Sequence, residues 1–498
     1  MQQKPNQFIR LRQQKLEKIK AMGIDPYPVE SSRSHSISNL LSDKDSWIAA
    51  ETQVTIAGRL VAMRRQGKLG FGNIEDASGK IQIYVQQNSL GEENYELFKL
   101  CDSGDFIQVT GILFYTQTGE YSLKCTSIKL LGKNIRPLPT VKEKIEDGKT
   151  IRYDEFADIE LRYRKRYLDL LLNPEHRKVF ELRSKLVTAI RHFMDARGYI
   201  EVETPILQPL YGGANARPFT THHNTLDVDL YLRIATELYL KRLIVGGFER
   251  VYEIGKNFRN EGMDRTHNPE FTLMEFYEAF SDLTGMMDIA EDLFKHLAWD
   301  IVGKDSFKYH GHEVCLSGTW RRASMPKLVT ENLGFEVEQA SYEELFAFCT
   351  KKEIEIPQGA GKGKLISLLY EHFVESKLIQ PTFVCDFPKE ISPLAKTKPG
   401  NPLLADRFEL IIAGNEFSNA FSELNDPFDQ RARLEAQAKL RELGDDEANV
   451  VDEDFLEALE YGMPPMGGQG IGIDRLIMLL TENDSIKEVI LFPQMKTS

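Results

Sequence analysis

The alternation of apolar and polar residues divides the chain into a β-rich first part and a longer second part of mixed strands and helices. From about Thr52 to Leu131, short alternating runs such as VTIAGRLVAMRR, KIQIYV and DFIQVTGILFY are separated by X-Gly turns. Alternation with period two is typical of strands, and about five strands joined by tight turns favour a small closed barrel. Residues 132–160, rich in charge and proline, then indicate a linker.

Helical periodicity is found both before and after the predicted barrel. Residues 4–20 carry six basic side chains and one acidic one, at a spacing that predicts an amphipathic helix closed by Gly23. Such a helix can hold phosphates, and it can equally be a solvated helix docked on its neighbour. Further helices are expected at about 174–197, where Gly198 ends the helix, and at 283–300.

The stretch Arg250–Tyr277 predicts the centre of the second part, two strand-like runs around a polar loop at residues 262–268. The residues expected at facing positions are polar or aromatic: Asn257, Arg259 and Glu261 on the first strand, and Phe271, Glu275 and Tyr277 on the second. A guanidinium, a flat ring and carboxylates make a poor hydrophobic core but a suitable floor for an anionic, aromatic ligand with a cationic companion. The alternative is a surface hairpin whose solvated side is simply polar.

Three later segments complete the second part. Residues 321–375 predict an insertion of helices with Gly-rich breaks. The GAGKGK run within it lacks the G-x-x-x-x-G-K-[ST] spacing of a phosphate-binding loop, which favours a flexible connector. Residues 442–460 predict a solvated acidic helix, and the glycine run before Arg475 leads into an apolar helix.

Composition restricts the class of protein. The chain has 498 residues, of which 42% are apolar and 28% charged, and this predicts a soluble globular protein of about two to four domains. Five scattered cysteines without a C-x-x-C motif, and the lack of a signal peptide or membrane-spanning run, indicate a reducing cytoplasm. The net charge of −13 argues against indiscriminate coating of nucleic acid and is compatible with contact through a local basic face.

Two arginines and two glutamates suggest triphosphate chemistry. Arg259 on the central strand and Arg475 at a helix N-terminus can each grip a phosphate, because a guanidinium is a planar fork and a helix N-terminus favours anions. A pair of ordinary ion-paired arginines is the alternative. Glu409 and Glu416 are separated by a Gly-Asn step at 414–415 that can turn the chain. If they converge, they would bind Mg²⁺ that bridges phosphate oxygens.

Three further acids have no role at the metal: Glu237, Glu275 and Glu423. Carboxylates near an anionic nucleotide repel it unless a cation lies among them. A substrate with two ammonium groups and one carboxylate, such as lysine, resolves this conflict, whereas an acidic amino acid would require Lys or Arg at these places. This interpretation requires Glu237 and Glu423 to lie close together, and not to be bonded to the protein's own lysines or arginines.

The segments taken together resemble a known family, the class II lysyl-tRNA synthetases of the bacterial and eukaryotic kind, over nearly the whole length. EVETPIL, FRNEGMDRTHNPEFTLMEFY and GIGIDR resemble motifs 1, 2 and 3, and GGANARPF, RIATELYLKRL, LIQPTFVCDFPKEISPLA and NAFSELND resemble family-specific blocks. Thr236, where many relatives have proline, and Gln469, which interrupts the glycine run, depart from the pattern without removing a charged group.

The resemblance implies an α+β fold, with an N-terminal OB-fold β-barrel and a class II catalytic domain built on an antiparallel sheet flanked by helices. The expected domains are a basic helical extension at 1–50, an OB-fold anticodon-binding domain at 51–135, a linker at 136–172, and a catalytic domain at 173–498 that contains the insertion at 321–375. The segment with Pro205 would lie at the interface of a homodimer.

The resemblance also implies a role for each candidate site residue. Arg259 and Arg475 are the expected catalytic residues, the first on the lysine carboxylate and α-phosphate and the second on the γ-phosphate. ATP would also contact Glu261, His267, Asn268 and Phe271, the last by stacking on adenine. The expected lysine-binding residues are Gly213, Glu237, Arg259, Glu275, Tyr277, Asn419, Phe421 and Glu423. Glu409 and Glu416 would hold Mg²⁺, and more than one ion is expected.

In the barrel, the resemblance matches Arg64, Phe71, Gln82 and Glu120 to positions that read the central anticodon uridine. The sequence by itself leaves Phe71 open, because a barrel phenylalanine can be a core residue or an exposed platform for a base.

The implied activity is that of a cytoplasmic lysine–tRNA ligase, which activates L-lysine with ATP and transfers it to tRNA(Lys). No membrane is expected as a partner. Three alternatives share parts of the pattern. An aspartate- or asparagine-specific relative is disfavoured by the acidic pocket, and a lysine-transferring protein modifier by the presence of the barrel. An RNA-binding protein with a dead catalytic domain is disfavoured because Arg259, Glu409, Glu416 and Arg475 are all present.

Overall fold

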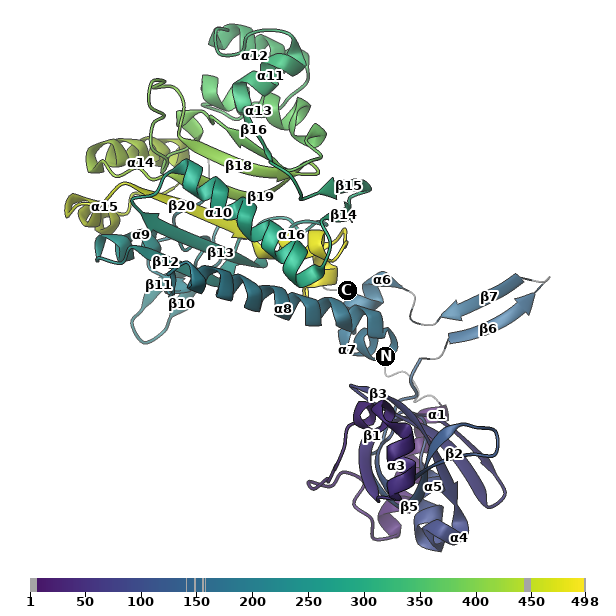
Figure 1. Cartoon of the computed structure of the whole chain (residues 1–498). Coiled ribbons are helices and arrows are strands. Elements are labelled where there is room, and N and C mark those ends of the chain that lie inside the picture. Colours follow the sequence, from purple (N-terminus) through teal and green to yellow (C-terminus); the bar gives the residue numbers. More distant parts are fainter. Residues whose placement is uncertain are drawn as a thin grey trace. The chain divides into compact units, whose positions relative to one another are not determined.

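The computed structural model describes residues 7–139, 141–146, 149–154, 156, 158–442 and 449–496. The chain forms two compact units, Met1–Ala157 and Asp158–Ser498 (Figure 1). Among the described residues, no helix is long and apolar enough to cross a membrane. Each unit has its own hydrophobic core.

The first unit is built on a closed five-stranded barrel, and the predicted OB-fold is confirmed. Its strands, in sheet order, are β1 (Val54–Gln66), β2 (Leu69–Asp76), β3 (Gly79–Gln86), β5 (Tyr121–Gly132) and β4 (Phe106–Tyr115). Alternate residues of each strand point inward, so that Ile56, Ile74 and Val109 are fully buried in one apolar core. Closure pairs every strand on both sides and leaves no free edge.

Short helices pack around this barrel: α1 (Gln7–Ala21), α2 (Ile37–Ser42), α3 (Lys44–Ala50), α4 (Gln87–Leu90) and α5 (Glu92–Leu100). Ile19 of α1 and Leu40 of α2 belong to the barrel core. Two basic side chains of α1 are engaged by the same unit, since Arg12 donates to the Ser103 carbonyl (3.0 Å) and Lys15 pairs with Asp102 (2.5 Å). These contacts favour the docked-helix alternative for this part of α1.

The predicted linker contains regular structure. The strands β6 (Val141–Glu146) and β7 (Lys149–Asp154) form an antiparallel hairpin. The helices α6 (Ile159–Arg164) and α7 (Arg166–Leu172) then open the second unit and precede α8 (Pro174–Ala196), whose predicted end at Gly198 is confirmed by a left-handed φ of +79°.

The second unit is organised by an eight-stranded sheet, counted over the described residues. In sheet order its strands are β16 (Arg321–Ser324), β17 (Thr382–Cys385), β18 (Arg407–Ile412), β19 (Asn415–Ser422), β20 (Met466–Gly472), β13 (Glu270–Ala279), β12 (Arg250–Phe258) and β8 (Ile200–Glu201). The neighbours pair antiparallel except at the two edges, where β8 and β16 run parallel to their partners. The predicted hairpin of β12 and β13 is confirmed, whereas the strand expected before Pro205 is only two residues long.

One face of the sheet carries the main core. The helices α8, α10 (Leu283–His296) and α16 (Ile473–Leu480) pack on it with the π-helical turn η1 (Leu297–Val302) (Figure 1). Even-numbered residues of β13 such as Met274 and Phe276 point into this core and are fully buried. The odd-numbered residues of β13 therefore face the other side of the sheet, as the alternation predicts.

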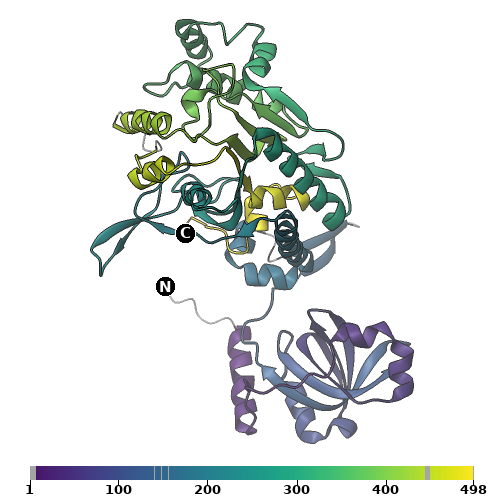
Figure 2. The ribbon, with the colours of Figure 1, turned by 60° about the vertical axis from the view of Figure 1, so that its left-hand side comes forward.

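Smaller elements surround the sheet. They are β9 (Leu207–Gln208), β10 (Thr220–His223), β11 (Val228–Leu232), α9 (Glu237–Val245), β14 (Ser306–Tyr309), β15 (His312–Cys315), η2 (Glu375–Lys377), η3 (Lys389–Ile391), α14 (Pro427–Glu442), α15 (Glu453–Glu460) and α17 (Ile486–Val489). The β10–β11 hairpin projects from the body of this unit (Figure 2). Of the acidic helix expected at 442–460, residues 453–460 are helical, and 443–448 lie outside the described residues.

The predicted insertion forms three helices with a core of their own, α11 (Met325–Leu333), α12 (Tyr342–Lys351) and α13 (Lys362–Phe373). Its first four residues are not helical, because they form the edge strand β16 on β17. In the GAGKGK run, the amides of Gly361 and Gly363 donate to the Glu390 carboxylate (2.8 and 2.9 Å). An internal acid thus occupies the amides that a phosphate would use, which agrees with a connector.

Candidate active site

A cavity of about 410 Å³ lies on the face of the sheet opposite the main core. Its floor is made by β13, β18, β19 and β20, and its walls by the loop between β12 and β13 and by the start of α9. Most of the residues proposed from the sequence line it: Gly213, Glu237, Arg259, Glu261, His267, Asn268, Phe271, Glu275, Tyr277, Glu409, Glu416, Asn419, Phe421 and Arg475. Segments separated by up to about half the chain therefore meet at one site.

The structure does not place two of the predicted residues on this cavity wall. Asn257 is buried beneath it with its Oδ1 lacking a hydrogen-bond partner among the described residues. Glu423, only 1% exposed, lies behind the wall. A methyl group on Gly468 would overlap both the Glu423 carboxylate and the Tyr277 ring, so this glycine lets the acid approach the cavity.

The glycine run places bare backbone beneath the ligand space. In β20, Gly468 and Gly470 are paired with Tyr277 and Glu275 of β13 and lie on the cavity side. The intervening Gln469 is 1% exposed and donates from Nε2 to the Ser418 hydroxyl (2.5 Å). Alternation thus assigns the one large side chain of the run to a buried hydrogen bond, which explains why it interrupts the glycines without filling the cavity.

A guanidinium and an aromatic ring face each other at one end of the cavity. The Arg259 guanidinium lies 5.1 Å from the centre of the Phe271 ring, within the range of a cation–π contact. The amide of Arg259 donates to the Pro269 carbonyl (2.9 Å), which closes the base of the loop. A flat group beside this pair would meet an aromatic face and a fixed positive charge together.

The loop between β12 and β13 is tied to the N-terminus of α16. Arg475 donates from Nη2 to His267 Nε2 (2.9 Å), and His267 Nδ1 lies 2.8 Å from Asp264 Oδ2. Because arginine can only donate, Nε2 accepts and the ring proton sits on Nδ1, facing Asp264. Burial would raise the pKa of Asp264, but hydrogen bonds from the Thr266 and His267 amides and the His267 ring lower it to about 2.

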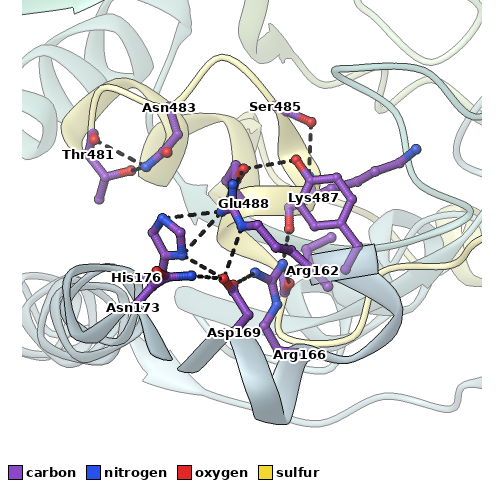
Figure 3. A network of polar contacts seen from close by, with 12 residues as sticks. Arg162, Arg166, Asp169, Asn173, His176, Thr481, Asn483, Ser485, Lys487 and Glu488 are labelled. Carbon is purple, nitrogen blue, oxygen red and sulfur yellow. Dashed lines mark hydrogen bonds and ion pairs between the residues drawn. The ribbon is translucent and has the colours of Figure 1, made fainter. Parts of the chain in front are cut away.

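A polar network joins α6, α7 and the start of α8 to the C-terminal segment that contacts this loop (Figure 3). Arg166 is 0% exposed, pairs with Asp169 (2.7 Å) and donates to the Lys487 and Leu491 carbonyls (2.5 and 3.0 Å). Burial would raise the pKa of Asp169, but its hydrogen bonds lower it to about 2. Directly before Lys487, the Ile486 amide donates to the Arg265 carbonyl (2.7 Å). The helices α6 and α7 thereby fix the segment that holds the loop.

Two carboxylates converge at the hairpin of β18 and β19, as the sequence required for a metal site. Burial, together with the charge of Glu416, raises the pKa of Glu409 to about 8, against the effect of Arg407. Within the described ranges, no group of three or more His, Cys, Asp or Glu side chains is arranged to hold a metal. Two carboxylates beside a triphosphate nevertheless fit Mg²⁺, which is commonly held by one or two carboxylates plus phosphate oxygens.

Arg407 is a site residue that the sequence interpretation missed. It lines the cavity, pairs with Glu409, and donates from Nε to Asn419 Oδ1 (3.1 Å) and from Nη1 to the Ser392 hydroxyl (3.0 Å). It stands two residues before Glu409 on one strand, so the period-two pattern places both side chains on the same face. This two-residue spacing from Glu409 could have identified Arg407 as a site residue from the sequence.

The three remaining acids lie near one another, but the charge argument made for them needs correction. Lys241 of α9, 0% exposed, lies 2.5 Å from Glu237 Oε1 and 2.5 Å from Glu423 Oε2. Glu237 and Glu423 are therefore close together as required, yet they are bonded to the protein's own lysine. The expectation that neither acid is bonded to a lysine or arginine of the protein was wrong, because one resident ammonium already lies between the two.

The acids still outnumber the resident cation. Burial, with the charge of Glu237, raises the pKa of Glu275 to about 7, and burial raises that of Glu237 against the opposing charge of Lys241. The Thr236 amide donates to Glu275 Oε1 (3.3 Å), and the Tyr277 hydroxyl donates to Oε2 (3.4 Å). A proline at position 236 could not make the first of these bonds. Ionisation of every acid here is costly until more positive charge arrives.

The barrel presents a second set of predicted residues on its outer face. Gly70, Gly72 and Ile74 of β2 are buried, so the alternate residue Phe71 points outward and is only partly buried. Arg64 lies 4.9 Å from its ring centre, and Tyr84 and Phe114 continue the row at 5.3 and 5.6 Å between successive rings.

The other two predicted barrel residues lie on β3 and in the turn before β5. Gln82 donates to the Ser122 hydroxyl (2.8 Å), and Glu120 is exposed. The platform alternative for Phe71 therefore has the required geometry, with polar side chains nearby that can read the edge of a base.

Comparison with known proteins gives the same division of the chain. A family described as tRNA synthetases class II (D, K and N) matches residues 158–496, and one described as OB-fold nucleic acid binding domain matches residues 54–131. Among curated relatives named Lysine--tRNA ligase, that of Thermoanaerobacter pseudethanolicus is 49% identical over 493 residues, 99% of this chain and 96% of the relative. The relative of Carboxydothermus hydrogenoformans is 49% identical to this chain and is matched over 99% of each chain. That of Bacillus subtilis is 48% identical, over 99% of this chain and 97% of the relative.

Proposed function

Since the chain belongs to the class II tRNA synthetases and, within them, to the lysine–tRNA ligases, we propose that the cavity on the β13–β20 sheet is where lysine and ATP meet. The enzyme activates L-lysine with ATP and transfers it to tRNA(Lys). The contacts around Arg259, Glu409 and Lys241 support this proposal.

The first step is attack of the lysine carboxylate on the α-phosphorus of ATP, with pyrophosphate as the leaving group and lysyl-adenylate as the product. Arg259 holds the lysine carboxylate and the α-phosphate, so that the attacking oxygen and the phosphorus approach in line. Phe271 stacks on adenine, with Glu261, His267 and Asn268 around the nucleotide. Arg475, fixed by His267 and by the Glu416 carbonyl, holds the γ-phosphate.

Glu409 and Glu416 are proposed to hold Mg²⁺, more than one ion being expected, against the phosphates. The bound metal would neutralise charge that develops on the pyrophosphate. The raised pKa of Glu409 supports this role, because two partly buried carboxylates that repel each other favour a cation beside them. Arg407 orients Glu409 and Asn419 from the same strand.

The second step is attack of the terminal adenosine hydroxyl of tRNA, which the family resemblance makes the 3′-OH, on the carbonyl of lysyl-adenylate. The new ester bond replaces the bond to the phosphate oxygen, and AMP leaves. No protein side chain forms a covalent bond in either step, so catalysis rests on positioning and on neutralised charge.

Recognition of lysine is proposed to use both of its ammonium groups. Gly213 and Glu237 would hold the α-amino group, and Glu423 and Tyr277 the side-chain ammonium, with Glu275, Asn419 and Phe421 completing the pocket. One observation carries this assignment: three buried acids converge on the cavity with a single resident ammonium among them. Size alone discriminates poorly between similar amino acids, whereas buried charges that need partners discriminate strongly.

Two further sites belong to the same proposal. Arg64, Phe71, Gln82 and Glu120 would read the central anticodon uridine, which the outward direction of Phe71 supports. A homodimer would form through the segment around Pro205, where apolar side chains are 44–50% exposed: Ile200, Ile206, Leu207 and Leu210. A monomer in sedimentation at working concentration would contradict the dimer. The activity supports a cytoplasmic location, since charged tRNA is used there.

The lysine-pocket assignment is tested by Glu423→Gln in ATP–pyrophosphate exchange. Loss of this buried acid should raise the KM for lysine by about 100-fold, roughly 3 kcal/mol, and leave the KM for ATP within about twofold. An unchanged lysine KM would contradict the assignment.

Exchange run once with each amino acid separates the alternatives. Stimulation by aspartate or asparagine would favour a relative of different specificity. No stimulation by any amino acid would favour an RNA-binding protein with a dead catalytic domain. Stimulation by lysine without charging of tRNA(Lys) would favour a protein modifier.

A further inference from the structure

Lys241 is a completely buried lysine whose only ionic partners among the described residues are two acids of the proposed lysine pocket. It lies one helical turn after Glu237, on the face of α9 that buries Leu240 and Ile244. This periodicity points its side chain at the sheet, where Glu423 directly follows β19. The Phe421 and Phe455 ring centres lie 5.3 and 5.9 Å from its ammonium and exclude water from it.

The ammonium leaves part of each acid available. It contacts Oε1 of Glu237 and Oε2 of Glu423, both at 2.5 Å. The second oxygen of Glu423, Oε1, is buried beside Gly468 and the Tyr277 ring and has no hydrogen-bond donor among the described residues. A buried carboxylate oxygen without a donor is costly, and a substrate ammonium entering past Tyr277 would supply the missing donor.

Charge counting gives Lys241 a specific effect. Glu237, Glu275 and Glu423 carry three negative charges when ionised, and Lys241 carries one positive charge, which leaves two. The positive charge of Arg407 also lowers the pKa of Glu237, but Arg407 is paired with Glu409 and is balanced there. Bound lysine brings two ammonium groups to these acids, while its carboxylate has Arg259. The pocket with Lys241 therefore balances the substrate's ammonium groups, and the pocket without it would keep one buried negative charge unmatched.

We propose that Lys241 is a positioning and specificity-determining residue for lysine, which holds Glu237 and Glu423 in place for the two substrate ammonium groups and sets the charge of the pocket. The inference rests on the proposed function, because it takes the lysine-binding roles of these two acids as given. A purely structural ion pair would stabilise the fold but would leave the proton balance of lysine binding unchanged.

The substitution Lys241→Met tests it with a side chain of similar length and no charge. Without the ammonium, one of the two acids takes up a proton, because burial raises the pKa of both and the neighbouring carboxylates raise that of Glu423 further. Lysine must then displace that proton. The KM for lysine should rise about 10- to 100-fold, with kcat within about threefold and the KM for ATP within about twofold.

Proton release supplies the second measurement. Calorimetric titration of the full-length enzyme with lysine at pH 7, in two buffers of different ionisation enthalpy, counts the protons released on binding. The Lys241→Met variant should release roughly one proton more than the unsubstituted enzyme. Lys295→Met is the matched control, since Lys295 makes a similar pair with Glu291 at 2.5 Å on α10, outside the cavity lining, and should change neither measurement.

The outcomes separate the two proposals. An unchanged lysine KM, an unchanged proton count, or equal losses for lysine and ATP would overturn the role of Lys241. If Glu423→Gln raises the lysine KM and Lys241→Met does not, only this inference fails, whereas an unaffected Glu423→Gln removes the pocket assignment itself. If Lys241→Met does not fold, Lys241→Gln, which keeps a polar group for the acids, is put through the same two measurements and judged by the same outcomes.

Discussion

The two recognition regions of the chain, the cavity of the second unit and the aromatic face of the barrel, are built from different kinds of contact. In the cavity the acids of the proposed lysine pocket and their lysine partner are buried charges, and Lys241 and Glu423 are at most 1% exposed. On the barrel, Arg64 is exposed and Phe71 is only partly buried in a row with Tyr84 and Phe114. Desolvated charges interact strongly, and each needs its partner. Stacked rings interact weakly, and the binding energy is distributed over several neighbouring rings.

This difference teaches that one substitution in the cavity should cost far more than one on the barrel. A small charged substrate offers few contacts, so each buried group has a large share of its binding and activation. A nucleic acid offers a long surface, so the loss of one ring is distributed over many contacts.

The largest effect is expected for Glu409→Gln. The variant removes one of the two carboxylates proposed to hold Mg²⁺ and leaves Arg407 without its acidic partner. Lysine-dependent ATP–pyrophosphate exchange should fall about 1,000-fold, roughly 4 kcal/mol, and the Mg²⁺ concentration for half-maximal rate should rise. Glu371→Gln, an exposed acid on α13, is the control and should have little effect. A loss below about tenfold, with an unchanged Mg²⁺ dependence, would contradict the metal role.

A smaller effect, confined to tRNA, is expected for Phe71→Ala. Stacking of one base is worth roughly 1–3 kcal/mol, and the lower end is expected here because Tyr84 and Phe114 continue the row, so the KM for tRNA(Lys) should rise about 5- to 10-fold. Exchange in the absence of tRNA should be unchanged, since the ring lies in the other unit. Phe106→Ala is a matched control, because Arg59 lies 4.2 Å from that ring centre elsewhere on the barrel. Equal effects of the two substitutions would show that Phe71 has no special role.

These two regions were also predictable from sequence to different degrees. In β13, strict alternation was enough to place Phe271, Glu275 and Tyr277 on the cavity side. In β2, glycines at positions 70 and 72 hide which face is buried, so the outward direction of Phe71 could not be read from the pattern. Local periodicity is visible in a sequence only where side chains mark both faces.

The contact of Lys241 with Glu423 could not be predicted for a different reason. The helix α9 and the end of β19 are far apart in the chain, and only tertiary packing brings this ammonium to that acid. The i, i+4 spacing of Glu237 and Lys241 was visible, but such pairs are common on helix surfaces and usually mark solvated faces. The count of charges in the pocket was wrong by this one residue, which no linear pattern reports.

The smallest expected effect is a pH dependence of the KM for lysine, which the cavity should show and the barrel should not. Burial and the charge of Glu237 raise the pKa of Glu275 to about 7, while the Thr236 amide and Arg259 oppose that shift. The amino groups of lysine stay protonated well above this pH. The KM for lysine should therefore rise a few-fold as the pH falls from about 8 to 6, because Glu275 gains a proton and attracts the substrate's ammonium groups less. The tRNA affinity of the barrel should not follow this titration.

The contribution of Glu275 to the free energy of unfolding should change with pH in the opposite direction to lysine binding. This distinguishes titration of Glu275 from a general loss of stability in acid. An acid with a raised pKa in the folded state binds its proton more tightly there than in the unfolded chain, so its contribution falls as the pH rises from about 4.5 through 7. Glu275→Gln removes this penalty. In urea unfolding of the ligand-free enzyme, the variant should gain stability relative to the unsubstituted enzyme on going from pH 5.5 to pH 8, although it binds lysine more weakly. If the difference in stability between the two proteins is the same at both pH values, Glu275 does not titrate in this range, and the charge of the lysine pocket is set by Glu237, Glu423 and Lys241 alone.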